Sequence, residues 1–289
     1  MLNSVDRILV AVRDLDQAEQ NYREVLGAQY LDELASDHLN ARGRSLVIGE
    51  STVELWTPRG AGVVSDHLDS FGEGLFFGGV STASLAECQR FLAEQGIRFA
   101  EADGRLYLNA GGLYGMPLVV SEAAARVRAN GPVSFLYELT MVLSTDWREV
   151  ADCYARKLGL QRDKAVDITF ARFGYEGTLL MFAPDRLDRI ELAEAHDPAF
   201  AMGRFSGKRG DALYMCYIET HDLADVIRRL ESRNAKWTRR TDTGKPEQDG
   251  LWIHPSALNG VLLGVSRTSL AWGWSGSPEK VEEISEVQS

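Results

Sequence analysis

Histidine and cysteine are the residues best suited to metal and nucleophilic chemistry, and their spacing in this chain favours neither. His38, His67 and His196 fall in polar, loop-like stretches without a second ligand two or four residues away, so we expect them to be solvated. His221 precedes a predicted helix and fits a capping position. The cysteines are odd in number and far apart, which predicts reduced thiols rather than a disulfide framework. They are Cys88, Cys153 and Cys216.

The composition is that of an acidic globular protein. The chain has 289 residues, 45% of them hydrophobic, which is enough for two domains with cores of their own. Its formal charge of −11 argues against nucleic acid and against anionic membrane surfaces, since both reward a basic face. The N-terminus lacks a basic signal region, and no apolar run approaches the roughly 20 residues of a spanning helix. We therefore expect a cytoplasmic protein.

The elements that must position any site form a repeat. Four times, an alternating strand leads through a short turn into a helix that ends at a glycine or asparagine, and about three short strand candidates follow. The predicted helices span 16–26, 85–95, 147–158 and 223–233.

This repeat predicts an α+β protein of four βαβββ modules, paired into two cup-shaped domains. A single module cannot cover its own sheet, so two modules are expected to close around a shared concave face. The first domain would span 1–125 and the second 131–270, with a linker over 123–132 and a flexible C-terminal tail over 271–289. An α+β sandwich without internal symmetry is the alternative.

Two stretches of sequence carry a resemblance to a known superfamily. The opening VDRILVAVRDLDQAEQNYREVLG (Val5–Gly27) resembles the first module of the vicinal-oxygen-chelate superfamily, which includes glyoxalase I, bleomycin-resistance protein and the extradiol dioxygenases. The segment LWIHPSALNGVLLGV (Leu251–Val265) is similar to the last strands of another member, methylmalonyl-CoA epimerase. The resemblance implies the fold. It leaves the function open, because this scaffold carries isomerases, lyases, dioxygenases and ligand-sequestering proteins.

The resemblance also implies where a divalent metal would bind, on the first and last strands of the paired modules. The corresponding positions are Arg7, Glu54, Phe77 and Val119 in the first domain and Glu138, Leu180, Met215 and Gly264 in the second. Only the two glutamates have donor atoms suited to such an ion, and an arginine stays protonated with no lone pair to offer. We therefore expect no metal and no other cofactor, although a divalent metal remains possible.

Strand alternation predicts further lining residues of the second cup, and it leaves two candidates for one position. The third module has one residue more between strand and helix than the first, so Leu139 rivals Glu138 for the position facing the cup. Alternation favours Glu138, because Leu139 fits the face that packs against helices. The expected lining is Glu138, Thr140, Leu180, Phe182, Met215, Tyr217, Leu262 and Gly264.

A lone carboxyl group in an apolar cup is suited to proton transfer near neutral pH. Glu138 is therefore the candidate catalytic residue, with His254 as a second titratable group if it reaches the cavity. Alternatively, Glu138 pairs with a nearby arginine at the rim. His254 equally fits a turn histidine bonded to the backbone of its own loop, which we favour.

The first cup is expected to be a degenerate scaffold. Arg7 and Glu54 would face each other where the resemblance places a metal, either as a buried ion pair, which we favour, or with Arg7 free to bind an anion. The expected lining is Arg7, Leu9, Glu54, Trp56, Phe77, Gly79, Pro117 and Val119.

Two classes of function fit these cups. The first is metal-independent binding of a small aromatic or oxygenated compound between rings such as Trp56, Phe77, Phe182 and Tyr217, as the bleomycin-resistance branch implies. The second is a lyase or isomerase that uses Glu138 as its general base. A metal-dependent dioxygenase or glyoxalase is a distant third, and a homodimer is possible.

Overall fold

The computed structural model describes residues 1–125, 127–240 and 249–283, and it contains the four expected modules in chain order. The first module is β1 (Leu2–Ala11), α1 (Leu15–Leu26), β2 (Gln29–Ser36), β3 (Ala41–Ile48) and β4 (Ser51–Pro58). The second is β5 (Gly74–Thr82), α3 (Leu85–Glu94), β6 (Phe99–Ala102), β7 (Arg105–Leu108) and β8 (Leu118–Glu122). The third is β9 (Val133–Leu143), α4 (Trp147–Leu158), β10 (Val166–Phe170), β11 (Tyr175–Met181) and β12 (Arg189–Glu194). The fourth is β13 (Ala212–Thr220), α6 (Leu223–Ser232), β14 (Trp237–Arg240), β15 (Gly250–Ile253) and β16 (Leu262–Arg267).

The module helices begin and end where local capping chemistry places them. The side chain of Asp14 accepts hydrogen bonds from the backbone N–H groups of Asp16 and Gln17 at the start of α1. Gly27 ends that helix with φ +68°, a left-handed conformation that glycine adopts without strain. The fourth helix likewise ends near Asn234, at φ +49°.

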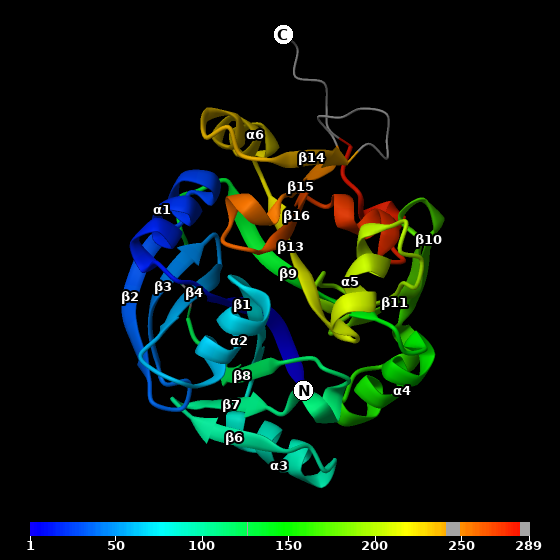
Figure 1. Ribbon diagram of the computed structural model, residues 1–289. Coiled ribbons are helices and arrows are strands. Elements are labelled where there is room, and N and C mark those ends of the chain that lie inside the picture. The colour runs from blue at the N-terminus through cyan, green and yellow to red at the C-terminus, as the bar shows by residue number, and fades with distance from the viewer. Residues whose placement is uncertain (126, 241–248, 284–289) are drawn as a thin grey trace.

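Each pair of modules forms one curled eight-stranded sheet, and the predicted fold is confirmed. The strand orders are β2-β3-β4-β1-β5-β8-β7-β6 and β10-β11-β12-β9-β13-β16-β15-β14. In both sheets the first strand of a module pairs in parallel with the last strand of the same module and antiparallel with the first strand of the next. The two halves of the molecule are therefore built to the same plan (Figure 1).

The two sheets share one hydrophobic core on the faces turned away from the cups. This core contains Ile8 and Val10 of β1 together with Leu139 and Met141 of β9, two strands that lie side by side at the centre of the molecule (Figure 1). A Cβ on Gly78 would lie 2.4 Å from Leu139 Cδ1, so the absence of a side chain there lets the sheets approach. Leu139 therefore belongs to the core, and Glu138 faces the cup.

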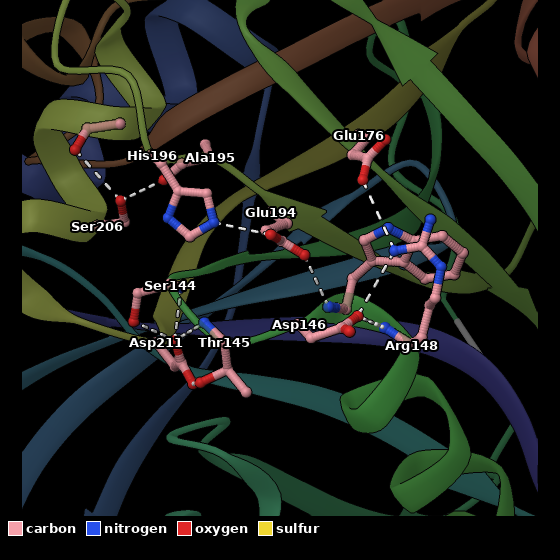
Figure 2. A network of polar contacts seen from close by, with 12 residues as sticks. Ser144, Thr145, Asp146, Arg148, Glu176, Glu194, Ala195, His196, Ser206 and Asp211 are labelled. Carbon is pink, nitrogen blue, oxygen red and sulfur yellow. Dashed lines mark hydrogen bonds and ion pairs between the residues drawn. The ribbon is translucent and has the colours of Figure 1, made fainter.

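Two further helices, α2 (Val63–Phe71) and α5 (Ala201–Arg209), connect the modules within each domain. Figure 2 shows the polar network that holds the segment around α5 in place. Ser144 and Thr145 each donate a backbone and a hydroxyl hydrogen bond to Asp211, and Ser206 donates to the carbonyl of Ala195. Burial alone would raise the pKa of Asp211, but these hydrogen bonds lower it. The carboxylate thus anchors the chain directly after α5.

The C-terminal segment differs from the expected flexible tail. Leu270–Trp274 forms a short 3₁₀-helix, and Ser275 is buried beneath the second cup, where it accepts a hydrogen bond from Arg189. The buried arginine gives this segment a polar anchor that composition alone does not reveal. The end of the predicted tail, residues 284–289, lies outside the described residues.

In the described part of the chain, no helix is long and apolar enough to cross a membrane.

Candidate functional site

The strand register identifies equivalent positions in the two cups. Arg7 of β1 pairs with Gly79 of β5 as Glu138 of β9 pairs with Tyr217 of β13. Leu9 pairs with Glu54 of β4 as Thr140 pairs with Glu191 of β12. Glu191, rather than Leu180, is therefore the second-domain counterpart of Glu54. Leu180 lies on β11, one strand too early, and its side chain is buried in the shared core.

The first cup is filled by its own side chains. Glu54 is 2% exposed and lies 2.8 Å from Arg105 Nη2 and 3.8 Å from Arg7 Nη1, and Trp56 Nε1 donates to it. The predicted pair of Arg7 with Glu54 is present, but Arg7 is held more closely by Asp6, at 2.8 Å. Leu9, Trp56 and Val119 pack together around these charges. Two cations and two carboxylates balance where the superfamily resemblance places a metal.

The second cup contains a cavity of about 300 Å³ with aromatic walls. Eight of its lining residues are aromatic, from β10, β11, β13, β15 and the segments around α5 and the C-terminus. These are Phe170, Phe173, Tyr175, Phe200, Tyr214, Tyr217, Trp252 and Trp274. The polar lining residues are Thr140, Glu191, Thr238 and Arg240.

A buried ion pair lies beneath this cavity. Arg189 and Glu138 are 0% and 1% exposed, and Arg189 Nε donates to Glu138 Oε2 at 2.6 Å. Thr140 Oγ1 donates to the other oxygen of Glu138 at 2.9 Å. The guanidinium also lies 4.8 Å from the centre of the Tyr137 ring. Glu138 is thus held in place by partners on β9 and β12.

Glu191 is the carboxyl group that lines the cavity, and its surroundings disfavour its charged form. Burial and the neighbouring Glu138, to which it is hydrogen-bonded, raise the pKa of Glu191 well above its usual value. Arg189 and the hydroxyl of Tyr175 oppose this shift without cancelling it. A carboxyl group that holds its proton can donate a hydrogen bond, whereas a carboxylate can only accept one.

Ring contacts hold the aromatic side chains of the cavity wall in place. Trp252 Nε1 donates to the hydroxyl of Tyr217 at 2.6 Å, and a Cβ on Gly264 would lie 2.1 Å from the Tyr217 ring. Glycine at this position therefore leaves the space that Tyr217 occupies. The guanidinium of Arg240 lies over the ring of Trp274 at 3.9 Å. These contacts fix the aromatic surfaces before any ligand arrives.

Comparison with known protein families identifies the chain's relatives. Residues 4–114 match the Glyoxalase/Bleomycin resistance protein/Dioxygenase superfamily. A triple mutant of 4-hydroxymandelate synthase from Streptomyces coelicolor matches the whole chain in fold, with TM-score 0.75 and 14% identity over 97% of each chain. The vicinal-oxygen-chelate fold is thus present in its two-domain form, as predicted.

Two further solved structures are similar to parts or most of the chain. A fusion of a xylose isomerase-like TIM barrel with 4-hydroxyphenylpyruvate dioxygenase has TM-score 0.61 and 12% identity, over 92% of this chain and 49% of its own. Methylmalonyl-CoA epimerase from Mycobacterium tuberculosis has 23% identity and TM-score 0.42, over 49% of this chain and 92% of its own. No curated protein matches the chain by sequence.

The site residues predicted for the second domain divide into two groups. Thr140, Met215, Tyr217 and Leu262 line the second cavity. Phe182 does not: its backbone bonds to Asp188 in the connection between β11 and β12, and its ring packs against the shared core. His254 also lies outside this cavity. Its side chain accepts a hydrogen bond from Ser256 N, which fits the turn histidine that we favoured.

Sequence reasoning missed Glu191, Arg189 and Arg240. The first four residues of β12, Arg189–Leu192, alternate polar and apolar residues, which is the signal of a strand with one polar face. That face turns into the cup instead of into solvent. Trp274 of the C-terminal segment also lines the cavity.

Proposed function

We propose that the second cup binds a small aromatic compound carrying an oxygen acceptor, and that it does so without a resident metal ion. The observation that supports this most directly is a cavity with aromatic walls and, in its polar lining, the carboxyl group of Glu191, whose pKa is raised by burial and by Glu138. Its volume of about 300 Å³ lies at the lower end of the range of about 300–1,000 Å³ typical of ligand sites, which favours a compound of one or two rings.

The lining provides both contributions that such a ligand needs. Tyr217, Trp252 and Trp274 offer ring faces and edges, on which an aromatic ligand gains contact area without a charge partner. The proton of Glu191 offers a hydrogen bond to a carbonyl or hydroxyl oxygen. A buried donor left unpaired is unfavourable, so this proton favours ligands that present an acceptor over hydrocarbons of equal shape.

The donor set of the second cup does not suit a divalent metal. The four positions where the superfamily resemblance places ligands carry Glu138, Glu191, Met215 and Gly264. One carboxylate is bonded to Arg189, the other carboxyl group is protonated, and a thioether is a weak partner for a hard cation. Across residues 1–125, 127–240 and 249–283, no three His, Cys, Asp or Glu side chains cluster as a metal site.

Blocking the mouth of the cavity is expected to abolish binding. Ala201 is exposed and lines the cavity, so Ala201→Phe places a ring in its opening at little expense in stability. We expect acetophenone to quench the tryptophan fluorescence of the wild type, with or without EDTA, and to bind Ala201→Phe at least about tenfold more weakly. Ala199→Phe, at an exposed position outside the cavity, is the matched control.

Ethylbenzene, which has the same shape but no acceptor, should bind wild type more weakly than acetophenone. Equal binding of acetophenone to the wild type and Ala201→Phe would refute the site. A tightly bound divalent ion in the purified protein, with binding lost on chelation, would refute the metal-independent part.

Acid–base catalysis is the second candidate, because Glu191 is a carboxyl group that holds its proton at neutral pH beside a cavity. Glu191 would act as a general acid, which differs from the general-base role first expected of Glu138, since Glu138 is bonded to Arg189 and does not line the cavity. Glu191 would donate its proton to the carbonyl oxygen of a bound ketone while solvent water takes the proton from the α-carbon, and the reverse transfers would restore the ketone and the carboxylic acid. Deuterium incorporation into the methyl group of acetophenone, followed by NMR, should be faster with the wild type than with Glu191→Gln. Identical rates would exclude this activity for that ketone.

A further inference from the structure

A second cavity, of about 360 Å³, lies between the two domains. Its first-domain wall comes from α2 and the start of β5, and its second-domain wall comes from α5, β13 and the loop after β15. In Figure 1, α2 and α5 lie next to each other at the centre of the molecule. Clefts between domains are common ligand sites, because each domain supplies one wall.

Arg209, the last residue of α5, is the cation of this cavity. Its guanidinium lies 3.6 Å from the centre of the Phe71 ring and 5.2 Å from that of Phe205, so two aromatic rings from different domains hold it. Within the described residues, no hydrogen bond or ion pair engages its N–H groups, and burial without a compensating carboxylate lowers its pKa. When aromatic rings contact the flat faces of a guanidinium, the N–H groups at its edges stay available to bind an anion.

The other charged and titratable groups of the cavity do not neutralise Arg209. Glu73 accepts hydrogen bonds from Arg13 N at 2.7 Å and from Asn259 Nδ2 at 2.9 Å, which hold it on the opposite wall. Burial, with a smaller effect from Arg209, lowers the pKa of His67 to about 4, so this histidine is neutral at pH 7. His67 lies half-buried on α2, not in a solvated loop as expected from sequence. His254 is bonded to its own turn.

The two cavities are neighbours. Ala201, Tyr214 and Leu262 line both of them. These three side chains therefore form part of the wall between a ligand in the second cup and the cavity of Arg209. An extended substituent passing Tyr214 would bring its end towards the guanidinium.

We propose that the natural ligand is an aromatic compound with a carboxylate-bearing side chain, whose ring occupies the second cup and whose carboxylate binds Arg209 between the domains. This inference rests on the proposed function and adds the ligand's second group. A single carboxylate fits better than a doubly charged phosphate, because Glu73 lies in the same cavity and repels the added charge. The arginine offers paired N–H donors, which match the two oxygens of a carboxylate.

The test compares ligands that differ only in charge. Benzoylpropionate and benzoylbutyrate extend acetophenone by a carboxylate chain, and their primary amides keep the length without the charge. In the full-length protein, at low ionic strength, we expect the better carboxylate to bind about tenfold or more tightly than its amide. Arg209→Gln should reduce this preference to about twofold or less. Lys208→Gln, which removes an exposed cation from the same helix, should retain it.

Acetophenone separates the two proposals, because it reports on the cup alone. If acetophenone binds but neither carboxylate is preferred over its amide, the role of Arg209 is refuted and the cup remains. If a preference exists but survives Arg209→Gln, the anion binds elsewhere and the inference is also refuted. If acetophenone and all its derivatives fail to bind, the proposed function fails and the inference fails with it.

Discussion

Replacement of Arg189 by methionine is expected to lower the free energy of unfolding by about 3–5 kcal/mol. Arg189 is fully buried and donates hydrogen bonds to Glu138 and Ser275. Without the guanidinium, the carboxylate of Glu138 remains buried next to Glu191 without its ion-pair partner, and it must either stay charged at great cost or take up a proton. Urea denaturation at pH 7, followed by circular dichroism, measures the loss.

The double variant Arg189→Met/Glu138→Gln separates the ion pair from simple packing. It removes both charges and keeps an oxygen for Thr140, so it should recover at least half of the lost stability. Arg186→Met is the matched control: this half-exposed arginine pairs with Asp188 in the same connection, and its loss should change stability by less than about 1 kcal/mol. An Arg189→Met protein as stable as the wild type would contradict the buried pair. So would a double variant less stable than Arg189→Met.

The repeat could be predicted from sequence because its signals are local. Asp14 and Gly27 bound the first helix by capping, and the same pattern recurs in each module. The choice of Glu138 over Leu139 also followed from local alternation, since Leu139 meets Gly78 in the shared core. Periodicity was enough to predict which side chains face the core wherever one face of a strand is apolar and the other is not.

The partner strand of β9 could not be predicted in this way. The segments Tyr175–Met181 and Arg189–Glu194 both read as strands, and nothing local shows which of them returns to pair with β9. Choosing the earlier one put Leu180 in the cup and left Glu191 out. The cavity lining depends on pairings between distant parts of the chain, and so do the contacts of Arg189 with Glu138 and of Trp274 with Arg240.

The buried carboxyl groups of the two cups are compensated in different ways. In the first, Arg7 and Arg105 balance Asp6 and Glu54, and packed side chains fill the space. In the second, Arg189 is paired with Glu138, and burial next to Glu138 raises the pKa of Glu191. The second cup thus keeps a cavity, and the carboxyl group of Glu191 lines it.

The proton on Glu191 should be visible as a pH dependence of stability that Glu191→Gln removes. The pKa of Glu191 is raised in the folded protein, so the folded state binds one proton more than the unfolded state between the usual glutamate pKa, 4.5, and the raised value. Stability of the wild type relative to Glu191→Gln should therefore fall as pH rises through this window, with a slope of up to about 1.4 kcal/mol per pH unit. Below the window the difference should be constant.

Chemical denaturation of both proteins at several pH values from about 4 to 8 measures this slope. Taking the difference removes the contributions of all other titrating groups that the two proteins share. Glu176→Gln removes an exposed carboxylate on the neighbouring strand β11 and serves as the matched control, with no comparable slope expected. A difference that rises with pH would mean that Glu191 is a stabilised carboxylate. The cup would then have no acidic proton to offer a carbonyl oxygen, and the preference for acetophenone over ethylbenzene would lose its physical basis.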